Sequence, residues 1–309
     1  MKDIIDLPKI HKPKPIRNNP ELLTTHGKRP EWLKGKAPTG DSYQNIENLM
    51  RSKSLHTVCE EARCPNIGEC WGHGTATFMI LGDVCTRGCS FCAIKTGVPT
   101  YLNKNEPMDV AESVRRMKLK HADVTSVNRD ELEDQGSAIW AETIIKIREL
   151  NPNTSIEVLI PDFKGDIDCI ERVVKANPDI LNHNMETVPR LYKKIRPQAK
   201  YQRSLDLLDY CKQNGMRTKS GIMVGIGETD EEVIELMEDL VKIKLDIMTI
   251  GQYLQPTVNH SPVDRFVTPE QFLEYKRIGE ELGIGHVESG PLVRSSYHAH
   301  KHVNVNAIG

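Results

Sequence analysis

Apolar and polar positions follow two alternating patterns from residue 76 onward. Short apolar runs, typical of buried strands, are each followed by a longer stretch in which apolar residues recur every three or four positions, as on one face of a helix. The pattern predicts strands at 77–81, 122–127, 155–160, 179–184, 217–224 and 247–253, and helices at 108–119, 137–150, 167–176, 205–214, 230–243 and 269–282.

Strands that alternate with helices predict the α/β class with a parallel sheet. Right-handed crossovers would curl this sheet into a partial (β/α)6-type or a complete barrel. In such folds the chemistry lies at the carboxyl ends of the strands, and a cysteine motif at residues 85–92, called the first cysteine motif below, follows the first predicted strand.

Four regions follow from composition and pattern. Residues 1–55 are rich in proline and basic side chains and predict an extended arm, with a helical period only near 43–51. Residues 56–74 carry a cysteine motif, residues 75–285 form the predicted barrel, and residues 286–309 are expected to be a polar tail, irregular from Glu288.

Cys85, Cys89 and Cys92 lie within eight residues, spaced C-x3-C-x2-C. Thiolates this close chelate one centre, either zinc or an iron-sulfur cluster. Zinc in a structural site takes four protein ligands, whereas three cysteines on a four-iron cluster leave one iron open for a substrate or cofactor. Phe91 would place a flat ring beside such a centre, and core packing is its alternative role.

A second triad, Cys59, Cys64 and Cys70, is spaced C-x4-C-x5-C. Zinc with a distant fourth ligand would explain it, but a neighbouring three-thiol motif favours a second cluster. The C-terminal tail, with its hydroxyls and imidazoles, could supply the fourth ligand. The other two cysteines, Cys169 and Cys211, lie at apolar helix positions and are expected to be buried thiols.

Composition excludes several classes of function. The formal net charge is −2 with both signs mixed, which predicts no nucleic-acid surface. The longest apolar run is far shorter than the ~20 residues that span a bilayer, which predicts no membrane segment. Without a signal-peptide pattern the protein is expected in the cytoplasm, where cysteines serve as metal ligands or buried thiols rather than disulfides.

The motif at Cys85–Cys92, with an aromatic residue before its last cysteine, resembles the signature of the radical S-adenosylmethionine (SAM) superfamily. The resemblance implies that Cys85, Cys89 and Cys92 hold a four-iron four-sulfur (4Fe-4S) cluster. In that family the open iron binds SAM, and reductive cleavage of SAM yields a 5'-deoxyadenosyl radical. Polar residues at strand ends are the candidate cofactor contacts, namely Arg129, Asn184, Lys219 and Gln252, together with Phe91.

From about 58 to 299 the chain is similar to the lipoyl synthase family. The likeness rests on both triads, on Glu157-Val-Leu-Ile-Pro-Asp162, and on Arg294-Ser-Ser-Tyr297. It implies that Cys59, Cys64 and Cys70 hold an auxiliary 4Fe-4S cluster with Ser295 as fourth ligand, so the cofactors are two such clusters and SAM.

The same resemblance implies insertion of two sulfur atoms, at C6 and C8, into an octanoyl group on a lysine of a lipoyl carrier protein. The auxiliary cluster is the sulfur donor and is consumed. The implied partners are lipoyl domains of 2-oxoacid dehydrogenases, the glycine cleavage H protein, a reductant such as ferredoxin or flavodoxin, and a cluster-assembly carrier.

Two alternatives explain part of the pattern. A radical SAM enzyme of the biotin synthase or methylthiotransferase kind would share the first motif but lack the second triad paired with Arg294-Ser-Ser-Tyr297. A two-cluster electron carrier would explain six cysteines, but it would want four thiolates per cluster and a far smaller chain. SAM binding separates a carrier from an enzyme.

Overall fold

The computed structural model describes residues 30–33, 41–53, 55–62, 64–72, 75–296 and 299 of this chain. The chain divides into two compact units, and each is described by itself. The first holds the described residues of 41–87 together with 94–180, and the second holds 30–33, 88–93 and the described residues from 181 onward. Most of the predicted N-terminal arm lies outside the described residues, and the part inside them contains helix α1 (Asp41–Lys53).

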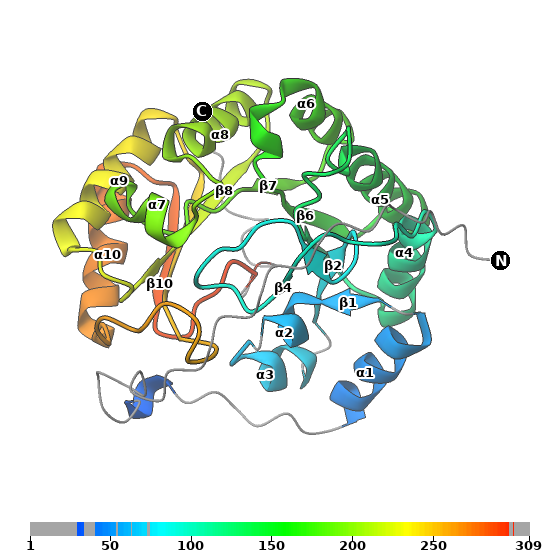
Figure 1. Ribbon diagram of the computed structural model, residues 1–309, viewed down its shortest axis with the longest axis horizontal. Helices are drawn as coiled ribbons and strands as arrows, with labels where there is room; N and C mark the ends of the chain where they lie inside the picture. The colour runs from blue at the N-terminus through cyan, green and yellow to red at the C-terminus, as the bar shows by residue number, and fades with distance from the viewer. Residues whose placement is uncertain are drawn as a thin grey trace. The chain divides into compact units, whose positions relative to one another are not determined.

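The first unit is built on a short, mostly parallel sheet. Strand β2 (Thr77–Ile80) pairs parallel with β5 (His121–Ser126), and β5 pairs parallel with β6 (Ser155–Leu159). The two-residue strand β1 (His56–Thr57) pairs antiparallel on the other side of β2. Helices α4 (Glu106–Met117), α5 (Ser137–Leu150) and α6 (Ile167–Lys175) connect the parallel strands, and neighbouring helices pack against one another along the sheet (Figure 1). The remaining elements of this unit are α2 (Val58–Glu61), α3 (Ile67–Gly72), β3 (Val84–Cys85), β4 (Lys95–Thr96) and the 3-10 turn η3 (Phe163–Gly165).

The second unit repeats this arrangement. Strands β7 (Ile180–Asn182), β8 (Thr218–Val224), β9 (Ile247–Gln252) and β10 (His286–Gly290) pair in this order, all parallel. Every residue of β9 is buried, as expected of a parallel strand covered on both faces. The helices are α7 (Tyr192–Ile195), α8 (Tyr201–Gln213), α9 (Asp230–Lys242) and α10 (Pro269–Leu282), and the 3-10 turns are η2 (Glu31–Leu33) and η4 (Pro189–Leu191).

The predicted α/β class and the alternation of parallel strands with helices are confirmed. Helix α10 has the predicted ends because both carry strong local signals. At the start, the Thr268 hydroxyl accepts a hydrogen bond from the Gln271 amide at 3.3 Å, and Pro269 is the first residue of the helix. At the end, Gly283 caps the helix in the left-handed conformation, with a φ of 112°.

Strand β10 is the clearest departure from prediction. The sequence analysis expects an irregular tail from Glu288, but residues 286–290 pair in register with β9, so that expectation is wrong for 288–290. Within β10 only Val287 is buried, so the segment lacks the apolar run by which the other strands are recognised.

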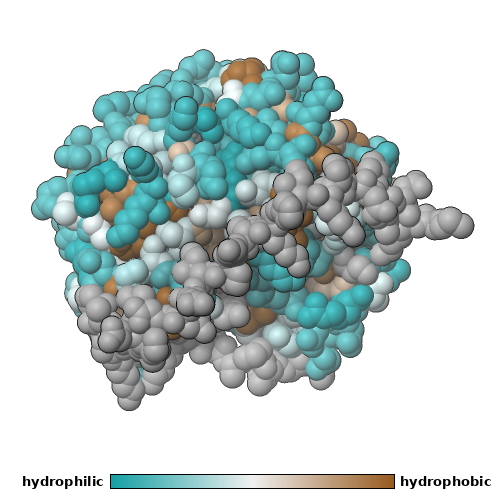
Figure 2. All heavy atoms as spheres, in the orientation of Figure 1, coloured by the Kyte–Doolittle hydropathy of each residue, from teal (hydrophilic) through white to brown (hydrophobic). Residues whose placement is uncertain are grey.

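Among the described residues, no helix is long and apolar enough to cross a membrane. Hydrophilic residues cover most of the described surface on the face shown in Figure 2.

Candidate functional site: two cysteine triads

The turn that leads from β2 into the first cysteine motif is held by two buried side chains. Leu81 and Gly82 both have a positive φ, 69° and 94°. The Leu81 amide donates to the Glu106 carboxylate at 2.7 Å, and the Leu81 carbonyl accepts from Arg129 Nη1, also at 2.7 Å. Burial raises the pKa of Glu106 to about 7. Because a left-handed conformation is unfavourable for leucine, these contacts fix a strained turn at the start of the motif.

Arg129, a predicted SAM contact, is the side chain that donates to this turn, and it is only 1 % exposed. Its Nε donates to Glu131 at 2.6 Å and its Nη2 to the Tyr101 carbonyl at 3.2 Å. The guanidinium therefore joins three backbone segments of the first unit. Contact with SAM stays a prediction for this residue.

Arg87, which lies between Cys85 and Cys89 in the sequence, forms two ion pairs. It meets the Asp130 carboxylate in a two-point contact at 2.7 and 2.8 Å, and Nη1 lies 2.7 Å from Asp162 Oδ1. Burial opposes the charge of Arg87, but hydrogen bonds and charges from Asp130 and Asp162 outweigh it and raise the pKa of Arg87 above its ordinary value. The motif is thus tied to the segments that follow β5 and β6.

The Cys85 sulfur accepts hydrogen bonds from backbone amides. The Asn128 amide lies 3.3 Å from Cys85 Sγ, and the Arg87 amide lies 3.5 Å from it. The Gly97 amide donates to the Cys85 carbonyl at 2.9 Å, beside the short pair of strands β3 and β4. Amide donors around a cysteine sulfur stabilise a thiolate and set the reduction potential of a cluster bound to it. Cys85 therefore suits an iron-sulfur ligand.

The second half of the motif is anchored within the second unit. The Ser90 amide donates to the Ile195 carbonyl at 2.9 Å, and the Ser90 and Ser261 hydroxyls lie 2.7 Å apart. His260 Nε2 lies 3.0 Å from the Cys92 carbonyl oxygen. These contacts hold the backbone around Cys92.

The second triad lies at the start of the first unit. Cys59 is in α2, Cys70 is in α3, and Cys64 lies between the two helices, with its amide donating to the Cys59 carbonyl at 3.0 Å. Burial and the neighbouring Cys64 raise the pKa of Cys59 to about 12, and burial and Cys64 also raise the pKa of Cys70 to about 11.

This mutual effect means that the three thiols of the second triad are near neighbours. Neighbouring thiols lose their protons when they bind a metal centre that supplies positive charge. The donor set of the second triad therefore fits a thiolate-bound metal centre.

Ser295, the predicted fourth ligand, accepts a hydrogen bond from Asn184 Nδ2 at 2.7 Å. The same amide group donates to Glu186 at 3.1 Å. Gly221 lets Asn184 approach, because a Cβ at residue 221 would lie 3.0 Å from Asn184 Oδ1 and would clash with the Thr249 hydroxyl. Ser295 belongs to the second unit and the second triad to the first, so ligation by Ser295 stays a prediction.

The other candidate cofactor contacts lie in the second unit. Lys219 is fully buried on β8, beside Asn182 of β7. Gln252 is also fully buried, and its amide nitrogen donates to the Val224, Tyr253 and Arg265 carbonyls. Phe91 and Cys89 are half-buried. A SAM contact stays a prediction for Lys219, Gln252 and Phe91, and ligation of a cluster stays a prediction for Cys89.

The remaining two cysteines are buried, as predicted. Cys211 is fully buried, and Cys169 is 4 % exposed with its thiol donating to the Asp134 carbonyl at 3.3 Å. They take no part in either triad.

Sequence reasoning missed the residues that hold the motif rather than ligate metal, namely Arg87, His260 and Ser261. A charged side chain inside the cysteine motif was the available signal for Arg87, since such a residue needs a partner where the motif is packed. His260 and Ser261 lie far along the chain, in a loop without periodicity, and left no signal.

Two family models match the chain. That of the radical SAM superfamily matches residues 79–240, and that of the N-terminal domain of lipoyl synthase of the radical SAM family matches residues 10–64. The first match covers both the first cysteine motif and most of the parallel strands.

Several relatives of high identity are lipoyl synthases. Lipoyl synthase of Rubrobacter xylanophilus is 59% identical over 278 residues, 89% of this chain and 86% of that protein. Lipoyl synthase of Flavobacterium johnsoniae is 57% identical over 89% of this chain and 96% of its own, and the mitochondrial lipoyl synthase of Nematostella vectensis is 54% identical over 89% and 95%.

Solved structures show the fold. The FeFe-hydrogenase maturase HydG from Carboxydothermus hydrogenoformans matches with a TM-score of 0.56 at 16% identity, covering 86% of this chain and 62% of that one. Methylornithine synthase matches with a TM-score of 0.53 at 15% identity, covering 81% and 75%.

The fold, the C-x3-C-x2-C motif after the first long strand and the superfamily match define a radical SAM enzyme. Membership implies a 4Fe-4S cluster and SAM as cofactors. The high-identity relatives narrow this class, and the chain belongs to the lipoyl synthase family.

Proposed function

We propose that this enzyme inserts two sulfur atoms, at C6 and C8, into an octanoyl group held on a lysine of a lipoyl carrier protein. The carrier would be a lipoyl domain of a 2-oxoacid dehydrogenase or the glycine cleavage H protein. One observation carries the proposal. A second set of three neighbouring thiols, Cys59, Cys64 and Cys70, accompanies the superfamily motif in a chain 59% identical to a lipoyl synthase.

Cys85, Cys89 and Cys92 would hold the cluster that meets SAM. When bound, this cluster supplies the electron that cleaves SAM to the deoxyadenosyl radical, which takes hydrogen from the octanoyl chain. The protein must hold its three thiolates in place while charge changes on the metal. The amides of Asn128 and Arg87 suit this role because they already donate to Cys85 Sγ.

Cys59, Cys64 and Cys70, with Ser295, would hold an auxiliary 4Fe-4S cluster. When bound, that cluster supplies the sulfur atoms that enter the product. A serine oxygen is a poorer match for cluster iron than a thiolate, so the Ser295 corner would be the easiest to open. Asn184 would orient this oxygen, since its amide already donates to Ser295 Oγ at 2.7 Å.

Binding of SAM by Phe91, Arg129, Asn184, Lys219 and Gln252 is part of the proposal. Arg129 donates to two backbone carbonyls and to the Glu131 carboxylate, and Gln252 donates to backbone carbonyls, so both would act through the segments that they hold. A reductant such as ferredoxin or flavodoxin would deliver electrons, and a cluster-assembly carrier would rebuild the auxiliary site.

The test starts from protein that is purified without oxygen and reconstituted with iron and sulfide. Iron content, deoxyadenosine and lipoyl product are measured on an octanoyl-lysine peptide. We expect about eight irons per chain, as two four-iron clusters require, and two sulfur atoms in each product. Half that iron content, with SAM cleaved and no sulfur transferred, would refute sulfur insertion.

Three cysteine variants separate the roles. Cys85→Ala is expected to abolish SAM cleavage, whereas Cys59→Ala should keep deoxyadenosine production and lose the lipoyl product. Cys211→Ala is the matched control, because it removes a buried thiol outside both triads. Lipoyl product from the Cys59 variant would show that the auxiliary role is wrong.

A further inference from the structure

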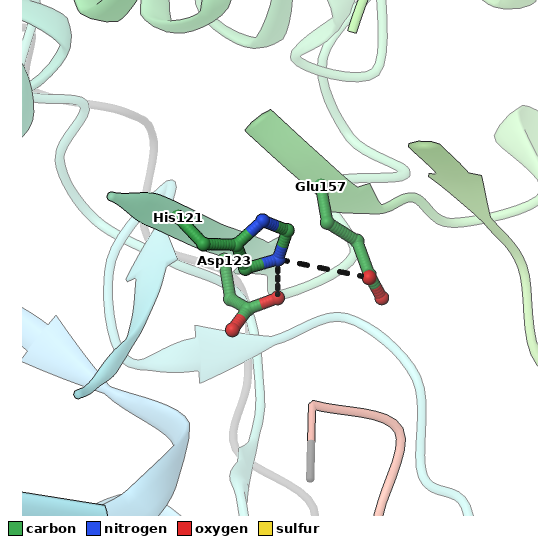
Figure 3. Close-up of side chains that lie close together, drawn as sticks. All are labelled: His121, Asp123 and Glu157. Carbon is green, nitrogen blue, oxygen red and sulfur yellow. Dashed lines mark hydrogen bonds and ion pairs between the residues drawn. The ribbon is translucent and has the colours of Figure 1, made fainter. Parts of the chain in front are cut away.

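Three side chains with nitrogen and oxygen donors gather on two neighbouring strands of the first unit. His121 and Asp123 project from the same face of β5, two residues apart, and Glu157 projects from β6 directly opposite Asp123. Figure 3 shows the imidazole Nε2 facing both carboxylates. Nε2 lies 3.3 Å from Asp123 Oδ1 and 3.9 Å from Glu157 Oε2.

The imidazole orientation is set by Ser155. His121 Nδ1 lies 2.7 Å from the Ser155 hydroxyl, and that hydroxyl donates to the Lys120 carbonyl at 3.2 Å. When the Ser155 hydroxyl donates to the Lys120 carbonyl, its oxygen accepts from Nδ1–H, and Nε2 then carries the lone pair of a neutral imidazole. An imidazole whose second nitrogen is fixed by such a hydrogen bond is the usual form of a histidine metal ligand.

A cation would balance the charges that meet in this arrangement. In this tautomer the Nε2 lone pair faces two carboxylates, and the side chains are only 6 % exposed for His121, 14 % for Asp123 and 3 % for Glu157. Protonation of the ring would supply one positive charge against two negative charges. A divalent ion balances both carboxylates and binds the lone pair of Nε2 directly.

The spacing suits one ion. The three donor atoms all lie within 4.8 Å of one another. Donors bound to one ion at about 2.1 Å lie at most about 4.2 Å apart, so a small rotation of the Glu157 side chain closes the site. One imidazole and two carboxylates form a donor set for Mn²⁺, Fe²⁺ or Zn²⁺, not for a thiolate-bound cluster.

We infer that His121, Asp123 and Glu157 bind one divalent transition-metal ion, at a site separate from both cysteine triads. The Asp123 charge also acts on Cys70, whose thiol pKa it helps to raise, so the site lies close to the second triad. Ferrous iron is the physiological ion we assign to it, and this choice of ion rests on the proposed function, because the second triad would bind an iron cluster.

Manganese is the direct probe, since Mn²⁺ prefers oxygen and nitrogen to sulfur and its electron paramagnetic resonance (EPR) signal distinguishes free from bound ion. Titration of the reconstituted full chain is expected to give one bound Mn²⁺. Asp123→Asn and Glu157→Gln should each weaken binding at least about tenfold, and Ser155→Ala should weaken it less. Glu149→Gln removes an exposed carboxylate of α5 and is the matched control.

A second measurement uses the unmodified protein, so it does not depend on how the variants fold. Pulsed EPR of bound Mn²⁺ should show coupling to one imidazole nitrogen, and its absence would overturn the inference. Equal Mn²⁺ affinity in the wild type and in Asp123→Asn would do the same and would leave a protonated histidine paired with carboxylates.

The choice of iron is tested by competition. Fe²⁺ is expected to displace Mn²⁺ without oxygen present, and failure to displace it would refute the iron assignment. Deoxyadenosine and lipoyl product are measured on the same samples. Bound Mn²⁺ without either product would count against the proposed function and support the metal site, whereas both products without Mn²⁺ binding would do the reverse.

Discussion

Replacing Arg87 should damage both the stability of the first unit and the chemistry of the first motif. The side chain is 5 % exposed and pairs with Asp162, which is fully buried, and with Asp130, which is 21 % exposed. In Arg87→Gln both carboxylates lose their counter-charge. Asp130 can recruit water, whereas the fully buried Asp162 carboxylate cannot, although it keeps a hydrogen bond from the Lys164 amide at 3.0 Å.

The expected loss follows from the cost of an uncompensated buried charge. Removing one partner of a buried pair costs roughly 3–5 kcal/mol, and here nearly all of it falls on Asp162. Arg87→Lys keeps the charge but cannot make the two-point contact with Asp130, so we expect about half that loss. Asp162→Asn in the Arg87→Gln background should recover part of it, because it removes the stranded charge.

The assay is urea unfolding followed by circular dichroism, with deoxyadenosine production measured on the same preparations. Arg87→Gln should lower the unfolding midpoint and slow SAM cleavage, since Arg87 lies between Cys85 and Cys89. A loss of stability below about 0.5 kcal/mol, the range of ordinary surface substitutions, would refute the reasoning. An unchanged midpoint in the double variant relative to Arg87→Gln would show that Asp162 is not the stranded group.

Three further predictions concern other buried contacts. Burial raises the pKa of Glu106 from 4.5 to about 7, so between these values the folded chain keeps a proton that the unfolded chain has lost. The free energy of unfolding therefore falls by about 3 kcal/mol as pH rises through this window. In Glu106→Gln the urea unfolding midpoint should change less between pH 5 and pH 8 than in the wild type, and an equal change in both proteins would contradict the prediction. Gly221→Ala should lower the melting temperature, at a cost of about 1–3 kcal/mol, because the new methyl group meets the Thr249 hydroxyl and Asn184. Asn184→Ala should loosen Ser295 and lower retained auxiliary iron and lipoyl product by more than it lowers deoxyadenosine production; full retention of auxiliary iron would remove Asn184 from this role.

Local signals made much of the fold predictable. Helices α5 and α10 begin and end where the sequence places them, since apolar periodicity and the flanking glycine, serine and proline residues agree. Strand β10 was missed because pairing with β9, rather than its own apolar content, makes it a strand. The three long-range contacts of Arg87 likewise depend on segments brought together only by folding.

The His121 site shows how a boundary error hides a site. The sequence predicts a strand from residue 122, whereas β5 begins at His121. That one residue decides whether the histidine shares a face with Asp123, since alternate residues of a strand face the same side. Glu157 joins them through the register between β5 and β6, which no local pattern encodes. The cysteine triads were predictable because their ligands are close neighbours along the chain.

The length of the short connection after β10 sets the position of Ser295. The Val293 amide donates to the Gly290 carbonyl at 3.1 Å, and the Val293 carbonyl rests directly on Gly251, where any Cβ would clash. One inserted residue would shift Ser295 by up to about 3.5 Å, more than the reach of its hydrogen bond to Asn184. Insertions and deletions in 291–294 should therefore be selected against more strongly than substitutions. Evolution would constrain the number of residues in this connection more tightly than their identity.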